Sequence, residues 1–289
     1  MSADWRPLNA PIKPRPGRAT IIPGMTQDLF RIDAYLTECS ATVTAITDHG
    51  IVLDRTVFYP LGGGQAGDAG MLVLADGSLL AIADTRKGKD AEGRFTHEIC
   101  HIPASDGHSV LSVQDLCAQR GLKTGATVTA RIDWDRRHRL MRFHTTTHLL
   151  CHIVPQLVNG CSITPDYARL DFAMTDPLDK DALSAAIATL VAAAHPVTVG
   201  SISDAELDAN PALVKSMSVQ PPRGSGTIRT IRIATATADA GRIGDTAMID
   251  FQPCGGTHVA NTAEIGAVIV TKIEKKSATT RRVVLGFAG

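Results

Sequence analysis

Hydrophobic and polar residues alternate along the first part of the chain. The segment ATVTAITDHGIVLD, residues 41–54, alternates on both sides of an Asp-His-Gly turn and predicts a hairpin. MLVLADGSLLAIADTR, residues 71–86, predicts a second hairpin with Asp-Gly at its turn, and ATVTARIDW, residues 126–134, predicts one more strand. Short strands with glycine-rich turns are typical of a small barrel. We therefore expect a β-barrel domain over residues 25–133.

The hydrophobic pattern changes its period from Arg136 onward. RLMRFHTTTHLLCHIVPQL, residues 139–157, and DPLDKDALSAAIATLVAAAHP, residues 176–196, carry apolar residues at helical spacing, with a proline near the end of each. Ser203 and Glu206 have the spacing of a capping box. Strand patterns are the segments ARLDFAM, TIRTIRIA, TAMIDF, GAVIVTKIEKK and RRVVLGFAG. Helices and strands in separate runs predict an α+β fold, here a two-layer core over residues 134–289.

Composition narrows the class of protein. The length of 289 residues fits one large or two modest domains, the hydrophobic content of 44% fits a soluble globular protein, and no apolar run is long enough to span a membrane. The formal net charge is zero, so any contact with nucleic acid needs a local basic patch. Residues 1–24 are proline-rich, lack the apolar centre of a secretory signal, and are expected to form a tail. Six scattered cysteines without an export signal predict reduced thiols in the cytoplasm.

Two short motifs predict a metal site. His144 and His148 are four residues apart in the predicted helix, so both imidazoles lie on one face. Cys254 and His258 flank a Gly-Gly-Thr turn whose glycines allow a sharp bend. Three imidazoles and one thiolate form a donor set that zinc accepts in a tetrahedron. We predict one zinc ion per chain.

The residues alone leave one alternative open. His152 continues the same helical stripe, and one ion cannot reach three successive turns of a helix that rises about 5.4 Å per turn. The pair is therefore either His144 with His148 or His148 with His152. Thr145 stands where a zinc protease helix carries its glutamate base, so a peptide bond is a poor target and an activated ester a better one.

Four blocks of sequence, in order, resemble the alanyl-tRNA editing proteins of the AlaX family, which are related to the editing domain of alanyl-tRNA synthetase. The blocks are FYPLGGGQAGDAG, DWDRRHRLMRFHTTTHLL, CSITPDYARLDF and IDFQPCGGTHVANTAEIGAVIVTKIEKK, followed by a closing RRVVLGF. The resemblance covers most of the chain from residue 25 and is closest to the medium-length members. It implies a barrel followed by an editing core.

The resemblance also implies an activity and its residues. Family members hydrolyse, without ATP, the ester of tRNA(Ala) wrongly charged with serine, and in some members with glycine. Carried over by motif, the zinc ligands are His144, His148, Cys254 and His258, which favours His144 over His152. We place these four and Gln65 in the catalytic set. The expected substrate-binding residues are Gly62, Gly63, Gly64, Thr145, Thr147 and Arg142.

The expected partner is mischarged tRNA(Ala), with no membrane contact and with a monomer and a dimer equally compatible with the sequence. Candidate phosphate contacts are Arg136, Arg137, Arg139, Arg142, Lys272, Lys275, Lys276, Arg281 and Arg282. Ser162 and Thr164 are further candidates for the pocket lining. Two other functions fit the same residues: a zinc hydrolase of another acyl ester, and a tRNA-binding protein whose zinc only stabilises the fold.

Overall fold

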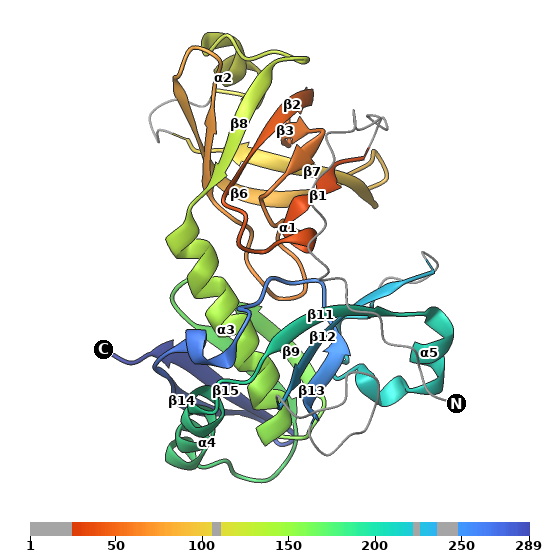
Figure 1. Ribbon diagram of the computed structural model, residues 1–289, viewed down its shortest axis with the longest axis vertical. Helices are drawn as coiled ribbons and strands as arrows, with labels where there is room; N and C mark the ends of the chain where they lie inside the picture. Colours follow the sequence, from red (N-terminus) through yellow and green to blue (C-terminus); the bar gives the residue numbers. More distant parts are fainter. Residues whose placement is uncertain (1–24, 106–110, 222–225, 236–247) are drawn as a thin grey trace. The chain divides into compact units, whose positions relative to one another are not determined.

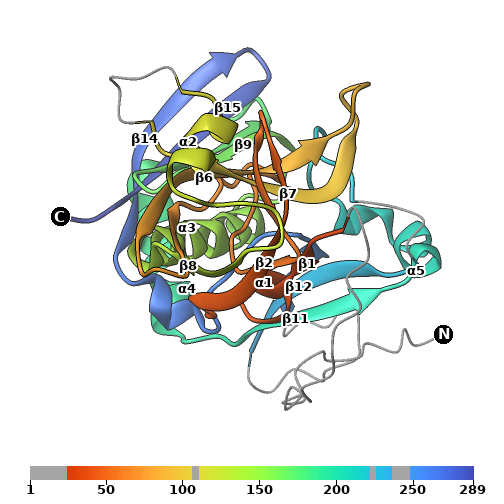
Figure 2. The same ribbon diagram turned by 90° about the horizontal axis from the view of Figure 1, so that it is seen from above.

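The computed structural model describes residues 25–105, 111–221, 226–235 and 248–289 (Figures 1 and 2). Internal contacts divide the chain into two compact units. In the described part, the first unit comprises residues 25–62 and Ala66–His138, and the second comprises Gly63–Gln65 and Arg139–Gly289. The expected tail, residues 1–24, lies outside the described residues.

The first unit is built mainly from strands. Its elements are β1 (Gln27–Asp28), α1 (Leu29–Ile32), β2 (Glu38–Thr47), β3 (Gly50–Leu53), β4 (Arg55–Thr56), β5 (Gly70–Val73), β6 (Leu79–Lys89), β7 (Phe95–Pro103), α2 (Val113–Gln119) and β8 (Thr127–Ile132). Six of them pair in the ring β2-β3-β7-β6-β5-β8, and β8 closes the barrel by pairing with both β5 and β2. Apolar side chains such as Leu53, Phe58 and Leu72 fill its core.

Both predicted hairpins are present. Thr47 of β2 pairs with Gly50 of β3 across the Asp-His turn, and Val73 of β5 pairs with Leu79 of β6 beyond the Asp-Gly turn. Buried and exposed residues alternate in the first half of β6, and this pattern fixes its register, because a slip by one residue would turn every side chain to the wrong face. The expected strand over residues 126–134 is β8.

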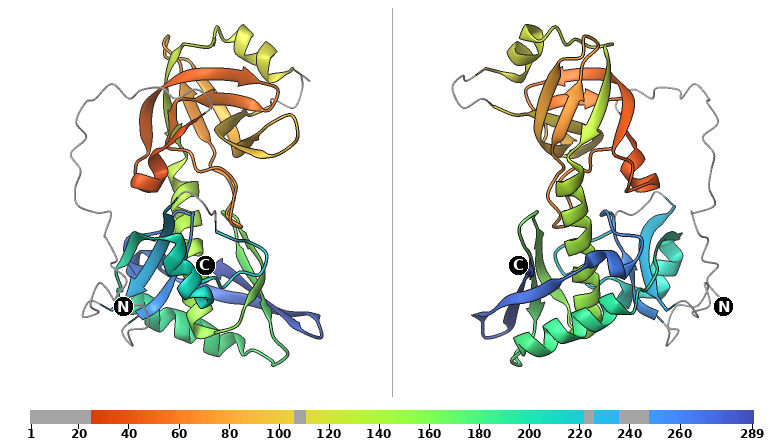
Figure 3. Two further views of the ribbon diagram at one scale, coloured as in Figure 1. Left: turned by 90° about the vertical axis from the view of Figure 1, so that its right-hand side faces the viewer. Right: turned by 60° about the vertical axis from the view of Figure 1, so that its left-hand side comes forward.

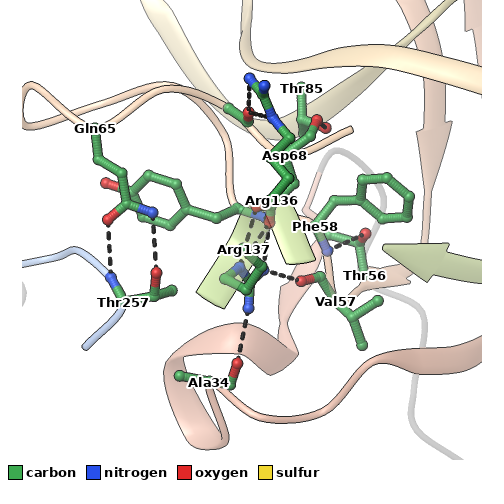
Figure 4. Close-up of polar contacts among 12 residues, drawn as sticks. Ala34, Thr56, Val57, Phe58, Gln65, Asp68, Thr85, Arg136, Arg137 and Thr257 are labelled. Atoms are coloured by element: carbon green, nitrogen blue, oxygen red, sulfur yellow. Dashed lines mark hydrogen bonds and ion pairs between the residues drawn. The ribbon is translucent and has the colours of Figure 1, made fainter. Parts of the chain in front are cut away.

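A buried ion pair ties the last residues of this unit to its core (Figure 4). Arg137 and Asp68 are both fully buried, and the Arg137 guanidinium donates to the Asp68 carboxylate and to the carbonyl oxygens of Ala34 and Val57. The backbone N–H of Tyr59 donates to the same carboxylate at 2.6 Å. Asp68 therefore anchors its own loop to Tyr59 and Arg137 through a buried charge.

The second unit combines helices and two sheets. Its elements are the later part of α3 (Trp134–Ile153), then β9 (Val158–Ile163), β10 (Ala168–Ala173), α4 (Lys180–Ala192), β11 (Val197–Ile202), α5 (Asp204–Ala209), η1 (Pro211–Leu213), β12 (Ile228–Ala234), β13 (Met248–Pro253), η2 (Thr262–Ile265), β14 (Val268–Ser277) and β15 (Thr280–Phe287). One sheet has the order β14-β15-β10-β9 and the other β11-β12-β13. The chain is thus a mixed α and β protein in which strands predominate, as its patterns predict.

Helix α3 lies between these two sheets (Figures 1 and 3). Its apolar residues Leu140, Phe143 and Leu149 are fully buried, which explains why the middle of this helix carries few charged residues. The predicted capping box at the start of α5 is complete, since Ser203 and Glu206 each bond the other's backbone N–H. Among the described residues, no helix combines the length and apolar character needed to cross a membrane.

Candidate metal centre

Helix α3 presents two histidines on one face. His144 and His148 are 5% and 4% exposed, and their rings lie 5.5 Å apart between centroids. The helix survives a run of three threonines because two hydroxyls bond carbonyl oxygens of the same helix: Thr146 donates to Arg142 and Thr147 to His144. Both imidazoles are buried, whereas histidine is only intermediate in its tendency to be buried. The buried pair therefore indicates a site inside the unit.

The Cys-Gly-Gly-Thr-His loop follows strand β13 directly. Arg229 of β12 holds this loop, because its guanidinium donates to the carbonyl oxygens of Cys254 at 2.7 Å and Gly256 at 3.0 Å. Gly256 lies against the His144 ring: a Cβ at residue 256 would come within 2.1 Å of the ring carbon Cε1. Only glycine lets the loop approach the helix this closely.

The two motifs converge on one point. The ligand atoms of His144, His148, Cys254 and His258 all lie within 4.8 Å of one another. The Cys254 Sγ lies 3.4 Å from Nε2 of His144 and 3.3 Å from Nε2 of His258. Such separations match neighbouring ligands around a single small ion, since bonds of about 2.0 Å to nitrogen and 2.3 Å to sulfur put tetrahedral ligands between 3 and 4 Å apart.

Each imidazole is held by a different protein group at Nδ1. The Gln65 Oε1 lies 2.7 Å from Nδ1 of His144, the Asp250 Oδ2 lies 2.7 Å from Nδ1 of His148, and the Thr145 Oγ1 lies 3.2 Å from Nδ1 of His258. The Gln65 carbonyl oxygen and the Asp250 carboxylate only accept, so Nδ1 of His144 and of His148 donates, and in the neutral rings Nε2 keeps a lone pair. The Nε2 side of each ring and the Cys254 sulfur therefore face the common centre.

Gln65 also fixes the turn of the metal-binding loop (Figure 4). Its Oε1 accepts from the backbone N–H of Thr257 at 3.1 Å, and its Nε2 donates to the Thr257 hydroxyl at 2.9 Å. This pattern sets the orientation of the amide, since only the oxygen can accept from both the Thr257 N–H and His144. The sequence placed Gln65 in the catalytic set; the structure places its amide between His144 and Thr257.

The electrostatics of the cluster favour a thiolate. Burial alone would raise the pKa of Cys254, but the imidazoles of His144 and His258 outweigh burial and hold it well below its usual value. Burial, joined by the charge of His144, holds the pKa of His258 well below its usual value. A thiolate and neutral imidazoles are the protonation states that bind metal. Burial alone would lower the pKa of His148, but Asp250 outweighs burial and raises it to about 9, so this ring gives up a proton when a metal binds. The donor set and its convergence therefore fit a zinc ion.

His152 does not join the cluster. Its side chain is exposed, one turn beyond His148, so the structure brings together His144 and His148. Cys151 is buried at 7% exposure, and burial raises the pKa of its thiol to about 12, as for a small apolar residue of the core. Of the two pairs that spacing left open, His144 and His148 lie on the covered face of α3.

The other predicted binding residues have protein partners of their own. The Thr145 hydroxyl accepts from the Val259 backbone N–H and lies 3.2 Å from Nδ1 of His258, and the Arg142 Nε donates to the carbonyl oxygen of Ile265 at 2.7 Å. In the glycine-rich motif, Gly63 and Gly64 have φ of +59° and +85°, and Gly64 accepts from the Ile163 backbone N–H. These contacts order the loop around Gln65, while Gly62 belongs to the first unit.

Several of the basic candidates are not available to a partner. Arg137 is fully buried, so its assignment as a phosphate contact was wrong. Arg281 donates to carbonyl oxygens of its own unit, and Arg282 is paired with Asp171 through two hydrogen bonds. Clustering in sequence did not distinguish solvated from paired cations. Candidates that remain exposed are Lys272, Lys275 and Lys276, of which Lys272 is paired with Glu274.

Sequence reasoning missed three residues around His148, namely Asp250, Gln252 and Lys215. Asp250 and Gln252 precede Cys254 by four and two positions, and side chains at this spacing share one face of a strand. That period of two was a usable signal, because it puts two polar side chains on the same face of β13 as Cys254, just before the loop that carries this cysteine. Lys215 lies outside any regular element and has no such signal.

Comparisons with known proteins identify the family to which the chain belongs. Residues 228–284 match the family described as the threonyl and alanyl tRNA synthetase second additional domain, and residues 29–136 match tRNA synthetases class II (A). The chain therefore has the domains of a protein related to class II synthetases. The family is identified by relatives that this chain matches over almost their full length.

The alanyl-tRNA editing protein AlaX-M of Methanosarcina barkeri is 34% identical over 267 residues, which cover 89% of this chain and 97% of the relative. That of Saccharolobus solfataricus is 30% identical, over 90% of this chain and 98% of the relative. The alanine–tRNA ligase of Metallosphaera sedula is 31% identical over 86% of this chain but only 25% of the ligase. This chain belongs to the alanyl-tRNA editing protein family of the AlaX-M type, and the resemblance found in its motifs is confirmed.

Proposed function

We propose that the protein is a zinc-dependent hydrolase that deacylates mischarged tRNA(Ala), chiefly seryl-tRNA(Ala), with glycyl-tRNA(Ala) as a second substrate. The observation that carries the proposal is the buried convergence of one thiolate and three oriented imidazoles in a member of this family. Alternative sets of donors are absent from the described residues, where this is the only group of its kind.

The need for such an activity follows from the size of the amino acids. A pocket built for alanine rejects glycine, or a residue with one added hydroxyl, by only about 1–3 kcal/mol. A second site that cleaves the wrong ester supplies the missing selectivity. The substrate is then an activated ester, which suits a site without a glutamate base at residue 145.

His144, His148, Cys254 and His258 would hold the zinc ion. When bound, zinc supplies a Lewis acid that polarises a carbonyl or a water and fixes the end of the substrate. The protein's own contribution is positioning. Gln65 holds both His144 and the Cys254–His258 loop at Thr257, so the helix and the loop are already ordered when substrate arrives. The terminal ribose hydroxyl of the tRNA takes the place of a protein base in moving the proton.

Of the two predicted threonines, Thr145 supports a role in recognising serine better than Thr147. When His258 binds zinc through Nε2, the Thr145 oxygen accepts two N–H donors, which leaves its own proton to donate to a serine hydroxyl. The Thr147 hydroxyl gives its proton to the His144 carbonyl oxygen. We assign the glycine-rich segment around Gly63 and Gly64 to binding of the aminoacylated end of the tRNA through backbone N–H groups. We also propose that the protein acts in the cytoplasm, with the translation machinery.

The test compares release of amino acid from seryl-, glycyl- and alanyl-tRNA(Ala) by protein with measured zinc content, beside a Cys254→Ala variant. We expect loss of serine and glycine, with alanine retained, and loss of activity in a variant whose circular dichroism is unchanged. Absence of hydrolysis by folded, zinc-loaded protein would refute the deacylase and favour another ester. If Cys254→Ala unfolds while the parent binds tRNA, the result would favour a zinc ion that only stabilises the fold.

A further inference from the structure

The three imidazoles of the metal centre do not have equivalent partners. His144 faces the neutral amide of Gln65, and His258 faces the neutral hydroxyl of Thr145. His148 alone faces a carboxylate, that of Asp250, whose side chain is fully buried. A buried carboxylate costs free energy unless it is paired, so its presence behind one ligand calls for a reason.

The partners of Asp250 use both of its oxygens. Oδ2 accepts from His148 Nδ1 at 2.7 Å and from the Gln252 amide at 2.9 Å. Oδ1 accepts from the ammonium of Lys215 at 2.5 Å. Every one of these groups donates, and only an ionised carboxylate can accept on both oxygens at once.

The backbone around Lys215 is fixed, so its ammonium arrives at Asp250 from a constant direction. The Lys215 carbonyl oxygen accepts from the Val158 N–H, and the Val158 carbonyl oxygen accepts from the Met217 N–H, both at 2.9 Å. The Lys215 side chain is three-quarters buried. The lysine thus compensates the buried charge of Asp250 at a defined position.

We propose that Asp250 and Lys215 together hold His148 in the tautomer that binds metal through Nε2, and thereby set the metal affinity of the centre. Asp250 accepts the Nδ1 proton, which directs the lone pair of Nε2 to the metal and makes the imidazole more basic. Lys215 neutralises Asp250 and occupies the oxygen that faces away from His148. Both are positioning residues. The inference rests on the zinc centre of the proposed function, but it concerns metal affinity and not the reaction.

The charge of Lys215 gives the idea a sharp test, because an amide has one oxygen and one NH2. In Asp250→Asn, the ammonium of Lys215 attracts the Asn oxygen and leaves the NH2 against His148 Nδ1. That nitrogen must then accept, so the proton moves to Nε2 and the imidazole can no longer bind. In Lys215→Met with Asp250→Asn, nothing attracts the oxygen away, and the Asn carbonyl turns to accept from His148.

The experiment measures the zinc dissociation constant of the full chain by competition with a chromophoric chelator, without tRNA. The visible spectrum of the cobalt-substituted protein reports the ligand set independently. We expect Asp250→Asn to bind zinc about 10–100-fold more weakly. We expect the double variant to bind at least several-fold more tightly than Asp250→Asn, and Lys215→Met alone to lose less than either. Glu274→Gln, which breaks the Lys272 pair on the surface of the same unit, is the matched control and should change nothing.

Two results would overturn the proposal: zinc affinity of Asp250→Asn within twofold of the parent, or a double variant no tighter than Asp250→Asn. If Asp250→Asn does not fold, the double variant is compared with Lys215→Met. Binding of zinc within tenfold of Lys215→Met, with an unchanged cobalt spectrum, then supports the proposal, and weaker binding refutes it. Deacylation by the parent is assayed separately, so a failure of the proposed activity leaves this measurement intact, and the reverse also holds.

Discussion

Gly256→Ala tests how closely the metal-binding loop and α3 must approach. The added Cβ would lie 2.1 Å from Cε1 and 2.4 Å from Nδ1 of His144. To reach the 3.4 Å of ordinary contact, the ring or the loop would have to withdraw by about 1.3 Å. Ligand distances in metal sites tolerate only about 0.2 Å. We therefore expect a displacement several times larger than the site can absorb.

The expected result is loss of stoichiometric zinc together with loss of deacylation, while the far-ultraviolet circular dichroism stays that of the parent. Zinc content after gel filtration and the cobalt spectrum measure the first effect. Gly160→Ala is the control, because it adds the same methyl in the same unit, where the nearest atom is the Asp171 carboxylate oxygen at 3.3 Å. One zinc per Gly256→Ala chain, with parental affinity, would refute the steric argument.

Two further predictions concern stability. Asp68→Asn leaves the buried guanidinium of Arg137 without its counter-charge and should lower the free energy of unfolding by about 3–5 kcal/mol. Glu38→Gln, which breaks the half-exposed pair with Arg131, should cost at most about 1 kcal/mol; equal urea midpoints for the two variants would contradict this. Burial lowers the pKa of His101 to about 4. The pKa of a histidine in the unfolded chain is about 6.5. The neutral, buried His101 therefore contributes about 3 kcal/mol to the free energy of unfolding above that pH, and this contribution is lost as the pH falls toward 4. His101→Gln should flatten this acid limb of the unfolding free energy, and an unchanged pH profile would rule out His101 as its source.

Local patterns were sufficient to predict the hairpins, α3, α4 and most strands of the second unit, because each has a strict period and a marked turn or cap. Strand β9 was missed since Asn159-Gly160 is a turn dipeptide. In the structure these residues stay in the strand, beside a register shift opposite Asp171 and Phe172, where a bulge absorbs them. Strands β7 and β11 were missed as well, and only their pairing with β6 and β12 identifies them.

The four residues that converge in the candidate metal centre could be found from two motifs, but their supporting groups could not. Gln65 is 79 residues from His144 and Asp250 is 102 residues from His148, so no local spacing relates them. Burial of Arg137 likewise depends on Asp68, 69 residues earlier. Charge and hydrogen-bonding capacity are visible in a sequence; which groups share one interior is decided by tertiary packing.

The pairing of Gln65 with Thr257 has a consequence for how the protein folds. The two residues are 192 positions apart, so this contact closes one of the longest loops in the chain. The barrel strands pair between residues 38 and 132 and can assemble while the rest of the chain is still being synthesised. Gln65 must wait for the Cys254–His258 loop, and metal capture is then a late event. We expect zinc to bind only chains that are complete through the Cys254–His258 loop. Nascent chains arrested before Cys254 should contain a folded barrel and bind no metal.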